Sequence, residues 1–147
     1  MSLFYLKTEP HITVIAPIDG EVIPYGETPF DDGISILARS NTVFSPISGT
    51  VTNVSANCMQ YTVMGNYGEK ITLQLYSDNI AIEYAPTVGQ KITVGEPIIR
   101  LRSDGRCPNG HTNILTLILD NSDEFRAITV FEGKCYSAKT EIMSFCR

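Results

Sequence analysis

The chain has 147 residues, which is enough for one domain with a hydrophobic core, because a domain of this size buries roughly two-thirds of the surface that its unfolded chain exposes. Its formal net charge of −5 and its pI near 4.9 argue against nucleic-acid binding, which requires clustered Lys and Arg side chains. We therefore expect its partners to be proteins or small molecules.

Short runs rich in Val, Ile, Thr and aromatic residues recur along the chain, and Gly, Pro, Asn or Asp separates them, which is typical of many short β-strands. Because no window keeps a helical stripe of apolar residues for three turns, we expect only one turn of helix, at Ser122–Ala127, capped by Ser122 or Asp123. The sequence thus predicts an all-β protein. The expected strands are, in chain order, Ile12–Ala16, Glu21–Pro24, Gly33–Ala38, Thr42–Ser45, Thr50–Val54, Gln60–Met64, Lys70–Tyr76, Lys91–Val94, Pro97–Arg102, Ile114–Asp120, Ala127–Phe131, Lys134–Ser137 and Glu141–Phe145.

Two internal repeats indicate how these strands are arranged. A P-I-x-G-x-V motif occurs at Pro17–Val22 and again at Pro46–Val51; in each copy we expect Pro to fix φ and Gly to take a positive φ. The segment Gly89–Leu101 aligns without a gap on Gly133–Phe145. The repeats predict a pseudo-duplicated, antiparallel β-sandwich or barrel that closes on itself, with each element of one copy facing its counterpart.

The four cysteines, Cys58, Cys107, Cys135 and Cys146, form no Cys-x-x-Cys pair, so neither a zinc ribbon nor a dense disulfide framework is visible. We expect reduced thiols in a cytoplasmic protein. The N-terminus has no basic region followed by an apolar stretch, and no apolar run approaches the ~18 residues that a bilayer span needs. Export and membrane insertion are therefore not expected.

Four segments have the order and spacing of the motifs of one known family. The pair Asp32–Ile36 and Phe44–Val51 is similar to its G-D-G-I-A-I and A-P-V-D-G-T-I motifs, Val88–Ile98 to its E-G-Q-x-V-x-x-G-D run, and Leu115–Glu124 to its T-P-V-V-I-S-N-M-D-E run. On these motifs the chain resembles the glucose-type IIA domains of the bacterial phosphoenolpyruvate-dependent sugar phosphotransferase system. The resemblance implies a flattened β-sandwich in one domain, residues 11–147, preceded by an extension of residues 1–10.

In that family one histidine accepts a phosphoryl group and a second histidine orients it. Aligning Val51–Leu75 without gaps places the accessory histidine at Met59 and the phosphorylated one at Gln74. An amide has no basic lone pair to attack phosphorus, and a thioether donates no hydrogen bond, so we expect no histidine phosphotransfer at these positions. We expect a binding depression formed by Asn57, Met59, Gln74 and Asp78.

The leading hypothesis is therefore a non-phosphorylatable regulatory or binding variant that needs no cofactor and binds protein partners in the sugar phosphotransferase or a regulatory pathway. The segment between Val22 and Gly33 is several residues shorter than the family loop that supplies apolar docking surface. Binding of the family's usual phosphorelay partners is therefore not implied by the resemblance. We expect no catalytic activity; an active chain would transfer phosphoryl groups as a IIA component.

Two alternatives remain open. One is a genuine phosphoryl carrier that uses a displaced histidine, for which His111 is the candidate. The other is a degenerate binding domain related to the lysostaphin-type zinc metallopeptidases, whose H-x-G-x-D and H-x-H motifs are represented here only by Asp31–Ser35 and His111–Asn113. Because zinc requires several converging ligands, we expect neither a bound metal nor an active peptidase.

Overall fold

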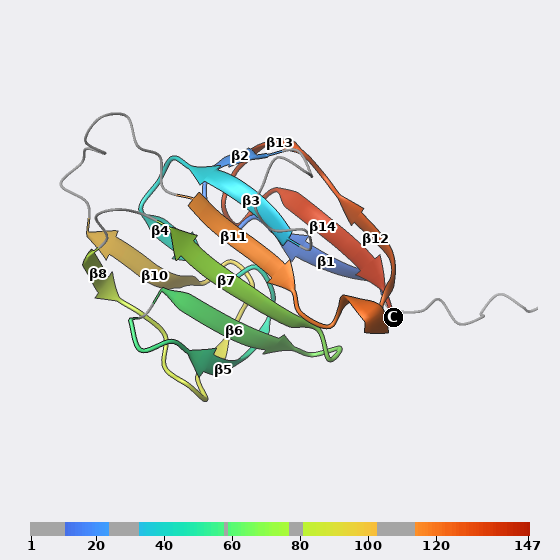
Figure 1. The fold of residues 1–147 in the computed structure, drawn as a ribbon, viewed down its shortest axis with the longest axis horizontal. Coiled ribbons are helices and arrows are strands. Elements are labelled where there is room, and N and C mark those ends of the chain that lie inside the picture. The colour runs from blue at the N-terminus through green and yellow to red at the C-terminus, as the bar shows by residue number, and fades with distance from the viewer. Residues whose placement is uncertain (1–10, 24–32, 58, 77–80, 103–113) are drawn as a thin grey trace, which may run out of the picture.

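A computed structural model describes residues 11–23, 33–57, 59–76, 81–102 and 114–147 (Figure 1). Within these ranges the regular structure is β, apart from one short 3-10 helix, η2 (Ser122–Glu124), so the all-β prediction is confirmed. The strands are β1 (His11–Ile15), β2 (Gly20–Val22), β3 (Gly33–Ala38), β4 (Thr42–Phe44), β5 (Gly49–Val54), β6 (Gln60–Gly65), β7 (Lys70–Tyr76), β8 (Ala81–Tyr84), β9 (Lys91–Ile92), β10 (Pro97–Arg102), β11 (Ile114–Leu119), β12 (Arg126–Val130), β13 (Gly133–Cys135) and β14 (Glu141–Cys146).

The largest sheet is antiparallel and has eight strands in the order β13-β2-β3-β11-β7-β6-β5-β9. Two smaller sheets have the orders β1-β14-β12 and β4-β10-β8. Figure 1 shows β3, β11, β7 and β6 side by side in the middle of the large sheet. Across the described strands this sheet ends at β13 and β9, so it does not close on itself, and the expectation of closure was wrong.

The two P-I-x-G-x-V copies bind each other through their backbones. The Ile15 N–H donates to the Pro46 carbonyl at 3.0 Å, and the Phe44 N–H donates to the Pro17 carbonyl at 2.7 Å. Each bond is the counterpart of the other, because Ile15 and Phe44 both lie two residues before the proline of their copy. The expectation that repeated elements face each other is confirmed for this pair.

Each copy is also bound by the matching hairpin of the second repeat. The Ala16 N–H donates to the Thr140 carbonyl at 2.7 Å, and the Ser45 N–H donates to the Glu96 carbonyl at 2.8 Å. Thr140 and Glu96 occupy equivalent positions in the gap-free alignment of the second repeat. The sequence repeats therefore correspond to a structural duplication around one hydrophobic core.

The glycines of the P-I-x-G-x-V motif have a different role from the expected one. Gly20 and Gly49 do not have positive φ. A Cβ atom on Gly20 would lie 2.0 Å from the Leu37 carbonyl oxygen, and one on Gly49 would lie 2.1 Å from that of Met64. Glycine is needed here because the backbone of a neighbouring strand passes too close for any side chain.

Two other expectations need correction. The strand β8 was missed, because Ala81–Tyr84 is a four-residue run beside a polar segment. The expected helix turn is shorter than predicted, and Asn121 precedes it in place of a Ser122 or Asp123 cap. The Asn121 side chain makes no cap bond; instead its Oδ1 accepts from the Lys70 N–H at 3.0 Å and its Nδ2 donates to the Gly68 carbonyl at 2.8 Å.

Candidate functional site

Gln74 lies in the middle of the large sheet and points away from the core. Its neighbours in β7, Leu73 and Leu75, are buried in the core, and side chains alternate along a strand, so Gln74 projects from the opposite face. On β6 the residue directly opposite Gln74 is Gln60, and on β11 it is Thr116. The amides of Gln60 and Gln74 and the hydroxyl of Thr116 thus occupy neighbouring positions on one face of the sheet.

These residues belong to a wider polar face. Its hydroxyls are linked in pairs: the Ser35 and Thr116 oxygens lie 3.4 Å apart, and those of Thr62 and Thr72 lie 2.9 Å apart. The Thr72 hydroxyl also donates to Asp120 Oδ2 at 2.5 Å. We call this group the polar face; its members are Ser35, Gln60, Thr62, Thr72, Gln74 and Thr116. Ser35, Thr72 and Thr116 are buried, while the other three are half-buried.

Half-buried apolar and aromatic groups flank the polar face at one end. Tyr76 lies opposite Ile114, which in turn lies opposite Leu37. Burial raises the pKa of the Tyr76 phenol above its usual value of 10.0, so this group is neutral at physiological pH. The polar face and its flank therefore offer hydrogen-bond donors, acceptors and apolar contacts, but none of their side chains named here is a basic nitrogen nucleophile.

The Met59 backbone lies beside the strand that contains Gln74, but the Met59 side chain has a different environment from that of Gln74. Its carbonyl accepts from the Leu75 N–H at 2.8 Å, and its side chain packs against the hydrophobic core. Its own N–H lies 3.1 Å from Asn57 Oδ1, which accepts from it and from the Ser55 hydroxyl. Asn57 therefore orders the turn before β6, and the residue that faces Gln74 across the sheet is Gln60.

The remaining candidate residues are placed as follows. Asp78 and His111 lie outside the described residues, as do Cys58 and Cys107. His11 is exposed on β1, in a different sheet from Gln74, and its Nδ1 lies 3.8 Å from the sulfur of Cys146. Across the part of the chain that the structure describes, no group of three His, Cys, Asp or Glu side chains is placed to hold a metal ion.

Gln60 and Thr116 were not among the residues expected at the site. The signal was present in the sequence, because Gln60 alternates with the apolar Tyr61 and Val63, and Thr116 alternates with Leu115 and Leu117. Alternation gives the face on which a side chain lies, but it does not give the register between strands. The pairing with Gln74 therefore required the structure.

Comparison with known proteins gives consistent results, although no family model matches the chain. The PTS system glucose-specific EIIA component of Staphylococcus aureus is 22% identical over 139 residues, covering 86% of this chain and 84% of that protein. The component of the same name from Buchnera aphidicola is 23% identical over 152 residues, covering 95% and 90%.

Two further similarities differ in extent. The N-acetylglucosamine-specific EIICBA component of Klebsiella pneumoniae is 25% identical over 144 residues, but the chain spans only 22% of that protein's length. Among solved structures, glucose permease IIA from Mycoplasma capricolum matches with a TM-score of 0.75 at 18% identity, covering 97% of this chain and 99% of the other.

The class of protein defined by the duplicated fold is the IIA-type β-sandwich. With sequence similarity to glucose-specific IIA components along most of its length, the chain is a glucose-type IIA-like protein, and the resemblance in the sequence motifs is confirmed. Among the described residues, no helix is long and apolar enough to cross a membrane.

Proposed function

We propose that this protein is a IIA-like component of the sugar phosphotransferase system that binds protein partners through the polar face without carrying a phosphoryl group. The observation that carries the proposal is the position of Gln74 at the centre of that face, where the family resemblance places the phosphorylated histidine. A glutamine amide can donate and accept hydrogen bonds but cannot attack phosphorus. In this proposal the face can bind a partner protein without accepting its phosphoryl group.

The composition of the polar face supports a role in binding. Its hydroxyl and amide groups lie beside the half-buried side chains of Leu37, Tyr76 and Ile114. Protein interfaces that form and dissociate commonly combine apolar and aromatic contacts with a limited number of hydrogen bonds and few charges at the centre. The relatives are named as phosphotransferase-system components, so proteins of that system are the proposed partners.

The binding module in this proposal is residues 11–147, and its compartment is the cytoplasm, as for an intracellular sugar-uptake system. A carrier that uses His111 is the main competing function. A lysostaphin-type binding domain is disfavoured by the sequence similarity to IIA components over 86% of the chain. The two competing functions predict different results in the experiment that follows.

The proposal is tested by titrating the isotope-labelled protein with the unphosphorylated general phosphotransfer proteins and following its backbone amides by NMR. Saturable shifts are expected at Gln60, Gln74 and Thr116. The variant Gln74→Glu, which introduces a charge at the centre of the face, should weaken binding, whereas Gln90→Glu in the turn before β9 should not. Shifts confined to other parts of the chain, or equal affinities of the two variants, would contradict the proposal.

A further inference from the structure

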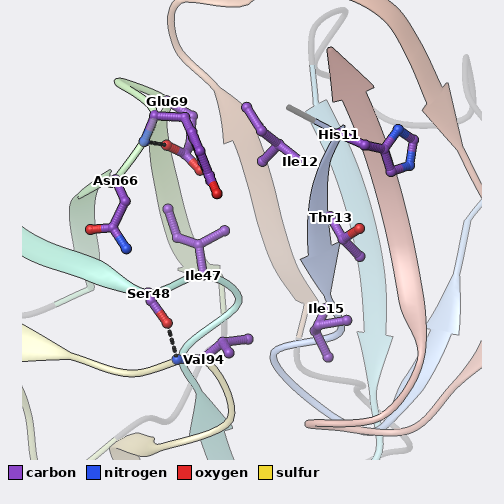
Figure 2. Close-up of a pocket in the computed structure, with 10 residues that line it drawn as sticks. His11, Ile12, Thr13, Ile15, Ile47, Ser48, Asn66, Glu69 and Val94 are labelled. Carbon is purple, nitrogen blue, oxygen red and sulfur yellow. Dashed lines mark hydrogen bonds between the residues drawn. The ribbon is translucent and has the colours of Figure 1, made fainter. Parts of the chain in front are cut away.

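A concave site lies away from the polar face. It is a groove of about 320 Å³ between β1 and the turns that contain Ser48, Asn66 and Val94. Figure 2 shows Asn66 and Glu69 on one side of the groove, with the β1 residues on the other. Gln60, Gln74 and Thr116 do not line it. The groove is therefore independent of the proposed partner-binding face.

The groove contains a buried carboxylate. Glu69, in the turn between β6 and β7, is only 2% exposed. Its Oε1 accepts from the Tyr67 N–H at 2.9 Å, and no other described residue donates to either carboxylate oxygen. A buried carboxylate normally accepts several hydrogen bonds or pairs with a cation, because removing it from water is costly. Glu69 therefore has unused acceptor capacity.

The local backbone makes room for this carboxylate. A Cβ atom added to Gly65 would lie 2.2 Å from both the carboxyl carbon and Oε1 of Glu69, so only glycine permits the side chain to fold over the turn. Arg147 reaches the same turn, but its Nη1 donates to the Tyr67 carbonyl. Its guanidinium carbon lies 5.7 Å from the centre of the Phe125 ring. Arg147 thus has partners other than Glu69.

The rim of the groove suits a cation on a short apolar stem. Tyr67 and Val94 are 48% and 41% exposed, and aromatic rings attract ammonium and guanidinium groups. The Ser48 hydroxyl accepts from the Val94 N–H at 2.9 Å, and its second lone pair can accept from a cation. The volume lies at the lower end of the range for ligand pockets, so the occupant is small.

We infer that this groove binds a small organic cation, a primary ammonium or guanidinium group on a short aliphatic stem, with Glu69 as its hydrogen-bond acceptor. This inference goes beyond the proposed function and does not depend on it. The cation completes the hydrogen bonding of the carboxylate, while Tyr67 and Val94 contact the stem. A neutral alcohol of the same shape keeps the stem contacts and can donate one hydrogen bond, but it brings no positive charge to pair with the carboxylate.

The test compares n-butylammonium with n-butanol as probes, using the Tyr67 amide as the NMR reporter. Saturable binding of butylammonium is expected, with butanol binding roughly tenfold or more weakly, because the charge pairing between the ammonium group and the Glu69 carboxylate is lost. The same weakening for butylammonium is expected in Glu69→Gln, which keeps an acceptor for the Tyr67 N–H. Glu21→Gln on β2, outside the groove, should bind as the unmodified protein does.

A second variant tests the inference even if Glu69→Gln does not fold. Val94→Lys, at the exposed rim, supplies an ammonium group that should compete for Glu69 and abolish binding of butylammonium. The inference is overturned if butanol and butylammonium bind alike, if Val94→Lys binds as tightly as the unmodified protein, or if no saturable shift occurs at millimolar ligand.

Discussion

Gln74 lies directly opposite Gln60 across the β6–β7 pair, and Thr116 of β11 lies on the other side of Gln74. The centre of the polar face is therefore built from two amides and a buried hydroxyl. None of the three is a nucleophile towards phosphorus at neutral pH. This composition is the basis of the proposed role in binding without phosphoryl transfer.

Replacing Gln74 with histidine should create a phosphorylatable site. An imidazole at this position is nucleophilic near neutral pH, and it would stand where the family resemblance places the phosphohistidine. After incubation of Gln74→His with phosphoenolpyruvate and the general phosphotransfer proteins, acid-labile, base-stable phosphate is expected on residue 74. Peptide mapping by mass spectrometry under alkaline conditions provides the measurement.

The matched control for this gain of function is Gln90→His. Gln90 lies in the turn before β9, where its side-chain oxygen accepts from the Thr87 N–H, and it is not part of the polar face. A histidine there should not be phosphorylated. Equal phosphate on the two variants would show that position 74 has no special relation to the phosphoryl donor.

The Thr72→Val variant should lower the free energy of unfolding by about 1–2 kcal/mol, because it removes a buried hydroxyl that donates to a carboxylate. Thr72 is 5% exposed and bridges Thr62 and Asp120. Valine has the same shape, so packing is kept. Urea denaturation measures the change, and Thr129→Val on the exposed strand β12 is the control. A loss no greater than that of the control would mean that the network contributes nothing.

Gly49→Ala should destabilise the protein by at least about 3 kcal/mol, because the new Cβ would lie 2.1 Å from a backbone oxygen and would force β5 and β6 apart. Gly133→Ala is the comparison, since no atom lies within 4 Å of its Cβ position and only the positive φ of 105° is strained. That strain costs about 1–2 kcal/mol. Thermal or urea unfolding that ranks Gly133→Ala as the more damaging change would refute the close-approach argument.

Cys135 should be alkylated much more slowly than Cys146 in the folded protein. Burial raises the pKa of the Cys135 thiol, the nearby Asp19 carboxylate raises it further, and a hydrogen bond from the Gly20 backbone opposes the shift. Because the thiolate is the reactive form, a raised pKa and burial both slow the reaction. Mass spectrometry of peptides from timed alkylation at pH 8 measures the two rates, and equal rates would contradict the buried placement.

The same thiol gives a pH dependence of stability. Its folded pKa is above the unfolded value, so the folded state holds the proton more tightly. Its contribution to stability is complete below the unfolded pKa of ~8.5 and is lost as the pH rises through the folded value. The variant Cys135→Ala should lose less stability between pH 8 and pH 10 than the unmodified protein, as measured by urea denaturation at each pH.

Much of the fold could be predicted from the sequence, because runs rich in apolar and β-branched residues, such as Gly33–Ala38 and Lys70–Tyr76, are found as strands with the expected bounds. The repeats also gave the pairing of the two halves. Short edge elements were harder, since β8 has only four residues and depends on pairing with β10. The expectation that the sheet closes on itself was wrong, because hydrophobic patterning does not determine which strands remain at an edge.

The site was predictable only in part. The resemblance proposes Gln74 for the candidate site, and the structure gave its cross-strand neighbours, Gln60 and Thr116, which depend on register. The groove at Glu69 had no signal in the sequence, since a glutamate in a Gly-rich turn is normally exposed to solvent. The Glu69 side chain is buried because it folds over the turn at Gly65.

The central claim is that the unmodified protein binds phosphotransferase partners but does not carry phosphate. The most direct test is the intact mass of the unmodified protein after incubation with phosphoenolpyruvate and the general phosphotransfer proteins, kept at alkaline pH to preserve phosphohistidine. The mass is predicted to be unchanged, with a known IIA component as the positive control. A stoichiometric gain of one phosphoryl group that His111→Ala abolishes would contradict the claim and establish a carrier with a displaced histidine.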